Sequence, residues 1–164
     1  MSKSELKAGS PAPGLSSVNQ VGERVRLEDF KGKWVVLYFY PKDNTPGCTI
    51  EANDFTKLLN DFQKMNAGVL GVSPDSCQSH VKFIKSQKLR ITLLSDPDHK
   101  LCEAYGVWQK KQFMGKSFMG VVRSTFLIDA EGKIAWASYG VKADGHAAAV
   151  RDTLKSLQSE AASV

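Results

Sequence analysis

Cysteine is scarce in this chain: its 164 residues include three, and an odd count does not suit the paired disulfides of a small secreted protein. Long hydrophobic runs are lacking as well, because no stretch approaches the ~20 apolar residues of a membrane span. The first ten residues, MSKSELKAGS, hold no apolar signal region. We therefore expect a cytoplasmic protein without membrane contact, in whose reducing surroundings cysteine is more often catalytic than structural.

Neither sign of charge is gathered into a block. The 22 Lys and Arg residues exceed the 17 Asp and Glu residues by five, and this mild excess is spread along the chain, so the composition gives no support to nucleic-acid binding. Hydrophobic residues make up 42% and charged residues 24%, which excludes a disordered or fibrous protein. At this length we expect residues 1–164 to form a single domain around one core.

Strand-like and helix-like segments alternate along the chain. Residues 34–40, WVVLYFY, are a continuous apolar run rich in β-branched and aromatic types, which predicts a central strand covered on both faces. Apolar residues then recur every three or four positions from Cys48 to Met65, which predicts one amphipathic helix. The stretch 107–120 has no period, and we interpret it as a long surface loop. Further strands are predicted at 68–72, 91–94, 121–128 and 133–139, and further helices after Asp75, after Asp96 and from His146 to about Ser159.

This order of elements predicts the class of fold. Strands that alternate with helices, followed by an antiparallel hairpin and a closing helix, indicate an α/β three-layer sandwich with a central mixed sheet and flanking helices. In such sheets the working residues lie beyond the carboxyl ends of the strands. The segment that follows the strongest strand, residues 41–48, is therefore the first place to look for a site.

The loop PKDNTPGC, residues 41–48, brings a cysteine into the first turn of a helix. Free backbone N–H groups and the helix dipole favour a thiolate there, but the dipole contributes only about 0.3–1 kcal/mol, so a second positive group is needed. Arg123 is the best placed of five arginines, because it stands at the mouth of a predicted strand. Thr45 lies three residues before Cys48, so its hydroxyl can reach the space above the sulfur. Plainer roles fit the same residues: Cys48 as a small hydrophobe on the helix, Thr45 as a helix cap and Arg123 in a surface ion pair.

Several segments of the chain resemble the peroxiredoxin Q / bacterioferritin comigratory protein (BCP) family of thiol peroxidases. They are VVLYFYPKDNTPGCTIEANDF, SPDS, SDPDHKLCEAYGVW and GVVRSTFLIDAEGKI. The resemblance covers nearly the whole chain from about Ala8, and its most specific part is a Pro-x-x-x-Thr-x-x-Cys loop with an Arg-Ser-Thr-Phe strand later in the chain. It implies a thioredoxin-like fold and an antioxidant enzyme that reduces hydrogen peroxide and alkyl hydroperoxides.

The resemblance also implies roles for individual residues. Cys48 is implied to be the peroxidatic nucleophile that becomes a sulfenic acid, Thr45 to orient the peroxide, and Arg123 to stabilise thiolate and substrate. Pro41 is implied to shield the sulfur from water. The backbone N–H groups of Gly47 and Cys48 add donors for the leaving oxygen. This chemistry requires no metal and no organic cofactor.

The sulfenic acid must then be captured by a thiol, and here the sequence departs from the family. Asn53 occupies the position five residues after the nucleophile where the family commonly has a resolving cysteine, and the alternative position in the next helix falls at Phe83 or Ile84. Cys77 is the leading internal candidate, because it lies near a predicted helix start and is expected to be partly exposed. Cys102 falls on an apolar stripe, which predicts a buried, inert side chain. An external thiol is the third possibility.

The resemblance implies thioredoxin, glutaredoxin or glutathione as the reductant and leans toward a monomer or weak dimer. Two other functions stay open. A thioredoxin-like disulfide reductase usually needs Cys-x-x-Cys, and Glu51 occupies the position of the second cysteine. A redox-sensing holdase or binding protein would use the same cysteine as a sensor. The three histidines have no ligand-like spacing and are interpreted as helix-surface residues, and the apolar side chains of 107–120 either line a pocket for an alkyl tail or pin the loop to the core.

Overall fold

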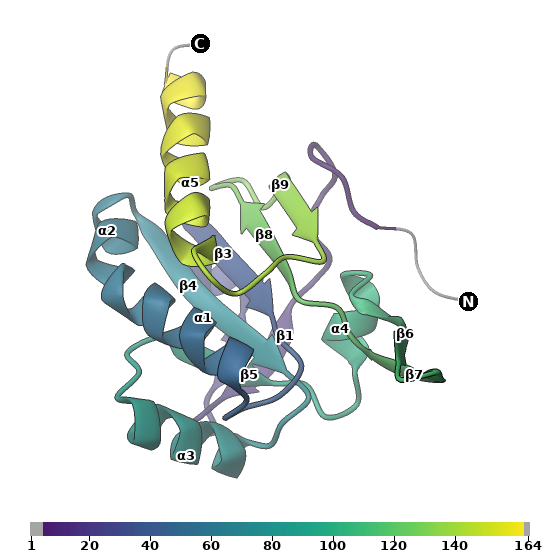
Figure 1. Ribbon diagram of the computed structural model, residues 1–164. Helices are drawn as coiled ribbons and strands as arrows, with labels where there is room; N and C mark the ends of the chain where they lie inside the picture. The colour runs from purple at the N-terminus through teal and green to yellow at the C-terminus, as the bar shows by residue number, and fades with distance from the viewer. Residues whose placement is uncertain (1–4, 163–164) are drawn as a thin grey trace.

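A seven-stranded mixed sheet forms the middle layer of the computed structural model, which describes residues 5–162 (Figure 1). Its strands are β1 (Ser16–Asn19), β2 (Arg24–Arg26), β3 (Trp34–Phe39), β4 (Ala67–Ser73), β5 (Thr92–Ser95), β8 (Ser124–Ile128) and β9 (Ile134–Tyr139). They lie in the order β2-β1-β5-β4-β3-β8-β9. Strands β3, β4 and β5 are parallel, whereas β8 pairs with β3 and with β9 in the antiparallel sense, as β1 does with β5 and with β2.

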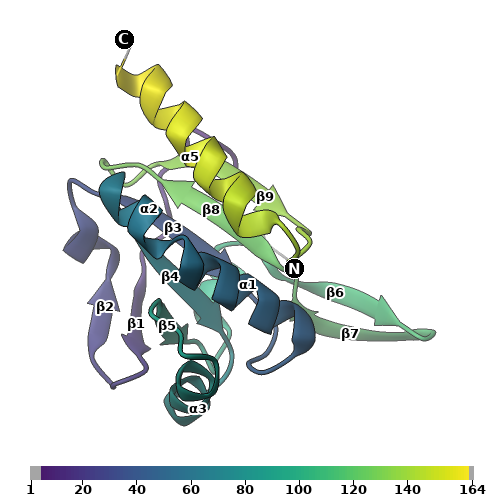
Figure 2. The same cartoon turned by 60° about the vertical axis from the view of Figure 1, so that its left-hand side comes forward.

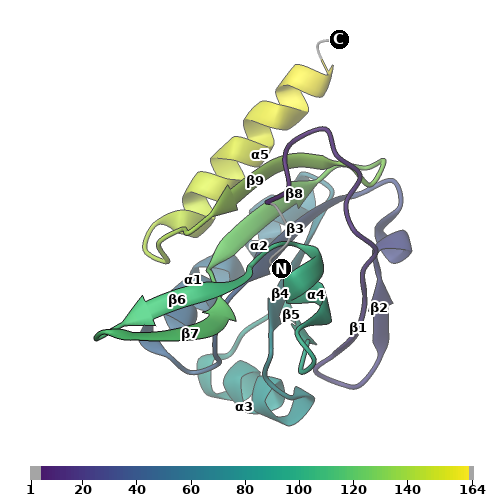
Figure 3. The same cartoon turned by 90° about the vertical axis from the view of Figure 1, so that its right-hand side faces the viewer.

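Helices cover both faces of this sheet (Figures 2 and 3). The helices are α1 (Pro46–Lys57), α2 (Leu59–Lys64), α3 (Cys77–Gln87), α4 (Lys100–Ala104) and α5 (His146–Ala162), with a 3-10 turn at Leu27–Phe30. Buried side chains of α1, α2, α3 and α5 belong to one core cluster, and those of α4 belong to the cluster on the opposite face. The predicted α/β sandwich with a central mixed sheet is therefore confirmed.

Strand β3 shows why the sheet is buried on both faces. Val36 and Tyr38 pack into the cluster under α1, and Val35, Leu37 and Phe39 alternate with them into the cluster under α4. All five side chains are buried, as the continuous apolar run 34–40 predicts.

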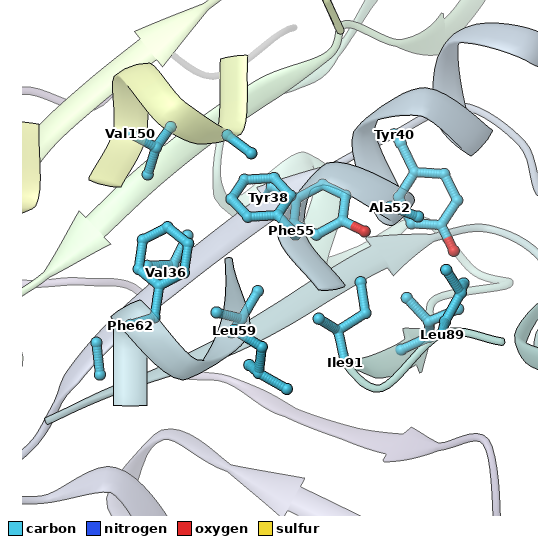
Figure 4. Packing of buried hydrophobic residues seen from close by; sticks show 14 of the residues in the cluster. Val36, Tyr38, Tyr40, Ala52, Phe55, Leu59, Phe62, Leu89, Ile91 and Val150 are labelled. Carbon is cyan, nitrogen blue, oxygen red and sulfur yellow. The ribbon is translucent and has the colours of Figure 1, made fainter. Parts of the chain in front are cut away.

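The core between the sheet and α1 fixes the helix that carries Cys48 (Figure 4). Phe55 of α1 stacks on Tyr38 of β3 with ring centroids 4.6 Å apart, and Phe62 of α2 lies 5.9 Å from Phe55. Val150 of α5 joins the same cluster. Because burial of each large side chain stabilises the fold by roughly 1.5–3 kcal/mol, α1 is held firmly against the sheet.

The predicted single helix from Cys48 to Met65 is two helices. The backbone leaves the helical region at Leu58, with φ −95° and ψ 3°, and α2 begins at the next residue. The break lets both Leu59 and Phe62 reach the core. Periodicity did not show it, because the apolar spacing of three and four continues across the break.

The prediction of a long surface loop at 107–120 is also wrong. The segment is an antiparallel hairpin of β6 (Trp108–Phe113) and β7 (Lys116–Val121), separate from the main sheet. Met114 and Gly115, both with positive φ, form its two-residue turn. No alternation of buried and exposed side chains marks its outer half, where both strands are solvent-exposed, so the sequence lacks the usual strand pattern.

Strand register brings the loop after β3 beside the start of β8. Phe39, the last residue of β3, pairs with Ser124, the first residue of β8. Because the pair is antiparallel, the residues just after Phe39 and just before Ser124 lie at the same edge of the sheet. Arg123 is thereby placed next to the loop that leads into α1.

Candidate active site

Cys48 lies in the first turn of α1, at the edge of the sheet where β3 ends. Thr45 is the extended N-cap residue, Pro46 is the first helical residue and Cys48 is the third. Proline suits that first position, because its fixed φ is helical and no N–H is needed there. The Cys48 side chain is only 1% exposed. The predicted placement of this cysteine at a helix N-terminus is therefore confirmed.

Arg123 contacts Cys48 directly. Its Nη2 donates to Cys48 Sγ at 3.2 Å, which places a guanidinium and a helix N-terminus against one sulfur. Gly47 makes room for this contact, since a Cβ at that position would lie 3.1 Å from Arg123 Nη2. The negative charge of a thiolate is favoured by both neighbours.

Glu51 holds the other side of the same guanidinium. Arg123 Nη1 donates to Glu51 Oε1 at 2.5 Å, and the carboxyl is fully buried. Burial raises the pKa of Glu51 to about 7 although Arg123 lowers it. Within the described residues, Glu51 Oε2 and the Tyr38 hydroxyl are the buried side-chain oxygens without a hydrogen-bond partner. Our sequence reading missed this role for Glu51; its position one helical turn after Cys48 was the available signal.

Thr45 and Pro41 lie in the loop that leads into α1, and the Thr45 side chain does not act as a simple helix cap. Thr45 Oγ1 donates to Lys42 O at 2.9 Å and does not cap α1, while its carbonyl accepts from Thr49 N at 2.9 Å. Thr45 and Pro41 are both half-buried. The hydroxyl keeps its acceptor lone pairs for a further donor.

A second buried polar network ties the loop before Cys48 to α3. The Asp43 carboxylate accepts from Tyr40 Oη at 2.6 Å and Ser79 Oγ at 2.7 Å, and His80 Nδ1 lies 2.8 Å from it. The other nitrogen of His80 lies 2.9 Å from Leu94 O, so it must donate. These hydrogen bonds lower the pKa of Asp43 against the effect of burial. The loop is therefore anchored to α3 through the Asp43 carboxylate.

The histidines do not all lie on helix surfaces as predicted. His80 and His146 are buried, and His146 Nε2 lies 2.7 Å from Thr125 Oγ1. Burial, with the positive charge of Arg123, lowers the pKa of His146 to about 4. His99 is half-buried and stacks on Trp108 with ring centroids 3.7 Å apart. Two buried polar positions were missed because helical spacing alone does not separate a satisfied core histidine from a surface one.

The other two cysteines lie in different surroundings. Cys77 is half-buried at the first position of α3 and borders a shallow surface pocket of about 610 Å³ together with Val21, Val81 and Pro97. Cys102 is buried in α4, and burial together with the Asp96 carboxylate raises its pKa. All three cysteines are free. The predicted exposure of Cys77 and burial of Cys102 are confirmed.

Residues 5–162 contain no cluster of three or more His, Cys, Asp or Glu side chains arranged to hold a metal ion. Nor does any helix among them have the length and apolar content needed to cross a membrane.

Comparison with known proteins gives the family. A model of the AhpC/TSA family matches residues 8–137. This chain belongs to the AhpC/TSA family and is a peroxiredoxin. It is 46% identical over 155 residues to Peroxiredoxin Bcp of Bacillus subtilis, covering 94% of this chain and 99% of the relative.

Solved structures of peroxiredoxins share the fold. A bacterioferritin comigratory protein of Xanthomonas campestris, studied for alkyl peroxide reduction, is 42% identical with a TM-score of 0.85, covering 92% of this chain and 98% of that one. PrxQ of Xylella fastidiosa is 39% identical with a TM-score of 0.88, covering 94% and 98%. The thioredoxin-like peroxiredoxin fold and the class of enzyme, a thiol peroxidase, are therefore confirmed.

Proposed function

We propose that Cys48 is the nucleophile of this peroxiredoxin. The observation that carries the proposal is the 3.2 Å contact of Arg123 Nη2 with Cys48 Sγ in the first turn of α1. A thiolate is the reactive form of cysteine, and this position supplies a positive charge and helix N–H groups to stabilise it. The thiol-peroxidase class of the enzyme requires a reactive cysteine, and Cys48 is the one whose neighbours carry positive charge.

The reaction that we propose balances without a metal or an organic cofactor. The Cys48 thiolate attacks one peroxide oxygen, the O–O bond breaks, and Cys48 becomes a sulfenic acid. The second oxygen leaves as hydroxide or alkoxide and takes a proton to become water or an alcohol. Arg123 and the first-turn N–H groups of Gly47 and Cys48 stabilise the charge that develops on this leaving oxygen.

We assign the loop residues supporting roles in the same step. Thr45 orients the peroxide, because its hydroxyl already donates to Lys42 O and can accept a hydrogen bond from the incoming substrate. Pro41, half-buried at the start of the loop, shields the sulfur from water. We infer that hydrogen peroxide and alkyl hydroperoxides are the substrates, the latter in line with the alkyl peroxide reduction for which the Xanthomonas relative was studied.

We infer that an external thiol, from thioredoxin, glutaredoxin or glutathione, reduces the sulfenic acid. Asn53, Phe83 and Ile84 occupy the positions at which the family has a resolving cysteine. Cys77 borders a pocket formed with Val21 of the β1–β2 turn, and β1 lies on the side of β4 away from β3. The pocket beside Cys77 therefore lies on the side of the sheet away from β3, the strand that leads to Cys48. A disulfide between the two cysteines would need Cα atoms within about 7 Å, and both cysteines stand in the first turns of separate helices, α1 and α3.

The same proposal includes the state and location of the protein. Of the seven exposed large hydrophobic side chains in the described chain, four lie on the narrow β6–β7 hairpin. They do not form the broad apolar face that a stable dimer buries, so we propose a monomer or weak dimer. Turnover consumes thiols, so we place the enzyme in a reducing, cytoplasmic environment. We also treat residues 1–164 as one domain.

The test of the nucleophile uses Cys48→Ser with Cys102→Ser as the matched control. Peroxide consumption driven by dithiothreitol should fall about a thousandfold or more in Cys48→Ser, because a hydroxyl is a far weaker nucleophile, and should remain near the wild-type rate in Cys102→Ser. Full turnover in Cys48→Ser would refute the proposal.

Intact-mass spectrometry after one equivalent of peroxide tests the reductant. We expect a gain of one oxygen in both the wild type and Cys77→Ser when no thiol is present. A loss of two hydrogens in the wild type that vanishes in Cys77→Ser would instead establish Cys77 as an internal resolving residue.

A further inference from the structure

The β6–β7 hairpin exposes a cluster of large hydrophobic side chains. Met114 at its turn is 86% exposed and the neighbouring Phe113 is 68% exposed, while Phe118 and Met119 are each about half exposed. The hairpin extends away from the seven-stranded sheet (Figures 2 and 3). These four side chains contribute little to the core, whereas Val107 and Trp108 at the base of the hairpin pack in or against the core cluster and pin that end of the segment. Apolar side chains gathered outside the core mark an interaction site.

The geometry of the hairpin turn does not explain why a methionine occupies position 114. Met114 and Gly115 have φ of 52° and 79°, the backbone of a tight hairpin turn in which asparagine or glycine is favoured at the first position. A methionine side chain in this left-handed region is strained, and its exposure means that no core packing offsets the strain. The hairpin thus keeps an apolar tip at a conformational cost. Neither the turn nor the core therefore accounts for an apolar side chain at this position.

The hairpin also carries charge of one sign. Its strands and turn, residues 108–121, contain Lys110, Lys111 and Lys116 and no aspartate or glutamate. Lys111 Nζ donates to Val121 O at 2.9 Å, whereas Lys110 and Lys116 are exposed. Three positive charges disfavour contact with the same hairpin of a second copy. They favour a partner whose contact surface is apolar and acidic.

The chain connects this hairpin closely to the site. β7 ends at Val121, and Arg123, which contacts Cys48, follows after a single residue. The base of the hairpin is fixed, since Val122 N donates to Val107 O at 2.8 Å. Figures 2 and 3 both place the hairpin at the end of the sheet where α1 begins. A macromolecule that brings a thiol to the buried Cys48 sulfur therefore approaches beside this hairpin.

We propose that the β6–β7 hairpin is the docking surface for a dithiol reductant protein whose surface around its thiols is apolar and acidic. This inference rests on the proposed function. One thiol of the reductant attacks the sulfur of the Cys48 sulfenic acid, which forms a mixed disulfide and releases water. The second thiol attacks the reductant's own sulfur in that bond, so Cys48 returns to the thiol and the reductant leaves as a disulfide. The two electrons come from the two thiols.

The first test reverses the exposed charges, with thioredoxin as the dithiol protein. Lys110→Glu/Lys116→Glu should raise KM for thioredoxin roughly tenfold and weaken its dependence on salt, because complementary charges at the rim of an interface steer association. Lys82→Glu/Lys155→Glu, on α3 and α5, changes the net charge equally and should leave KM unchanged. Oxidation of Cys48 by hydrogen peroxide and turnover with dithiothreitol should be unchanged in both variants.

The second test separates docking from folding. Met114→Asn suits the turn better, so its melting temperature should equal or exceed that of the wild type, while KM for thioredoxin should rise roughly fivefold through loss of the apolar tip. An unchanged KM in both hairpin variants would overturn the docking proposal.

Other outcomes would also overturn it and would identify a different occupant of the hairpin. These are a selective loss of activity toward alkyl hydroperoxides, a shift in oligomeric state measured by light scattering, and binding to anionic phosphatidylglycerol vesicles that Met114→Asn abolishes. None of these results would affect the assignment of Cys48, whose failure would instead be shown by turnover with dithiothreitol in Cys48→Ser.

Discussion

Cys48 and Cys102 occupy the same position in two different helices. Each is the third residue of its helix, α1 or α4, and each is buried, with 1% and 0% of the residue exposed. Their charged neighbours are opposite. Cys48 receives a hydrogen bond from the Arg123 guanidinium, whereas Cys102 lies beside the Asp96 carboxylate, which accepts from its backbone N–H at 2.9 Å.

On our proposal that Cys48 is the nucleophile, neither burial nor a helix N-terminus by itself decides whether a cysteine reacts, because Cys48 and Cys102 share both. In α4 the Asp96 carboxylate already occupies the first-turn N–H groups of Leu101 and Cys102, so the helix end is neutralised before a thiolate can use it. In α1 the N-cap Thr45 makes no side-chain hydrogen bond to the helix, and the first turn remains available to the sulfur and its substrate. We infer that the sign of the nearest charge makes Cys48 reactive and leaves Cys102 inert.

Removing Arg123 should abolish most of the difference in reactivity that we expect between Cys48 and Cys102. Arg123→Met should lower the second-order rate of Cys48 oxidation by hydrogen peroxide about 10²- to 10³-fold, or roughly 3–4 kcal/mol, as loss of one preorganised donor does in other enzymes. Stopped-flow measurement of Cys48 oxidation gives this rate. The control is Arg151→Met, which removes a surface ion pair with Asp61 and should leave the rate unchanged. An effect below tenfold in Arg123→Met would contradict the account.

The buried Glu51 should make stability fall with pH. Burial raises the pKa of Glu51 from its ordinary value of 4.5 to about 7 in the folded state, so between these pH values the folded state holds a proton that the unfolded state has released. Stability present below pH 4.5 is therefore lost as pH rises, by roughly 3 kcal/mol above pH 7. Glu51→Gln should remove this decline. Urea unfolding of both proteins at pH 5, 6, 7 and 8 measures it, and parallel pH curves would show that Glu51 does not titrate in this range.

The smallest effect concerns the negative neighbour of Cys102. Asp96→Asn should lower the free energy of unfolding by about 2 kcal/mol, because Leu101 N and Cys102 N donate to different carboxylate oxygens and asparagine replaces one of these with an NH2 group, which cannot accept. Burial remains the main cause of the raised pKa of Cys102, so its alkylation in the folded protein should increase no more than severalfold. Alkylation of Cys102 as fast as that of Cys48 would show that the carboxylate alone keeps it inert.

Local patterns in the sequence predicted the elements that carry Cys48 and Arg123. The apolar run 34–40 predicted β3, the loop that follows predicted Cys48 at a helix start, and Arg123 was identified at the mouth of a strand. Register then explains why these parts meet, because Phe39 pairs with Ser124. A strand pairing of this kind is not encoded in either segment alone.

Long-range contacts account for what the sequence did not predict. By sequence Glu51 resembles a surface residue of an amphipathic helix, and it is its contact with Arg123, in the segment between β7 and β8, that explains its burial. The buried His80 likewise depends on Asp43, which lies in a loop 37 residues away. The β6–β7 hairpin failed for a different reason. Its outer half faces solvent on both sides, so it lacks the pattern of buried and exposed residues that reveals a strand.

Mapping the oxidised sulfur compares Cys48 and Cys102 in one molecule, two equally buried cysteines with neighbours of opposite charge. Cys77→Ser protein is treated with one equivalent of hydrogen peroxide in the presence of dimedone, which traps sulfenic acid, and the labelled peptides are identified by mass spectrometry. We predict label on Cys48 and none on Cys102. Comparable labelling of the two cysteines, or labelling of Cys102 alone, would contradict the account.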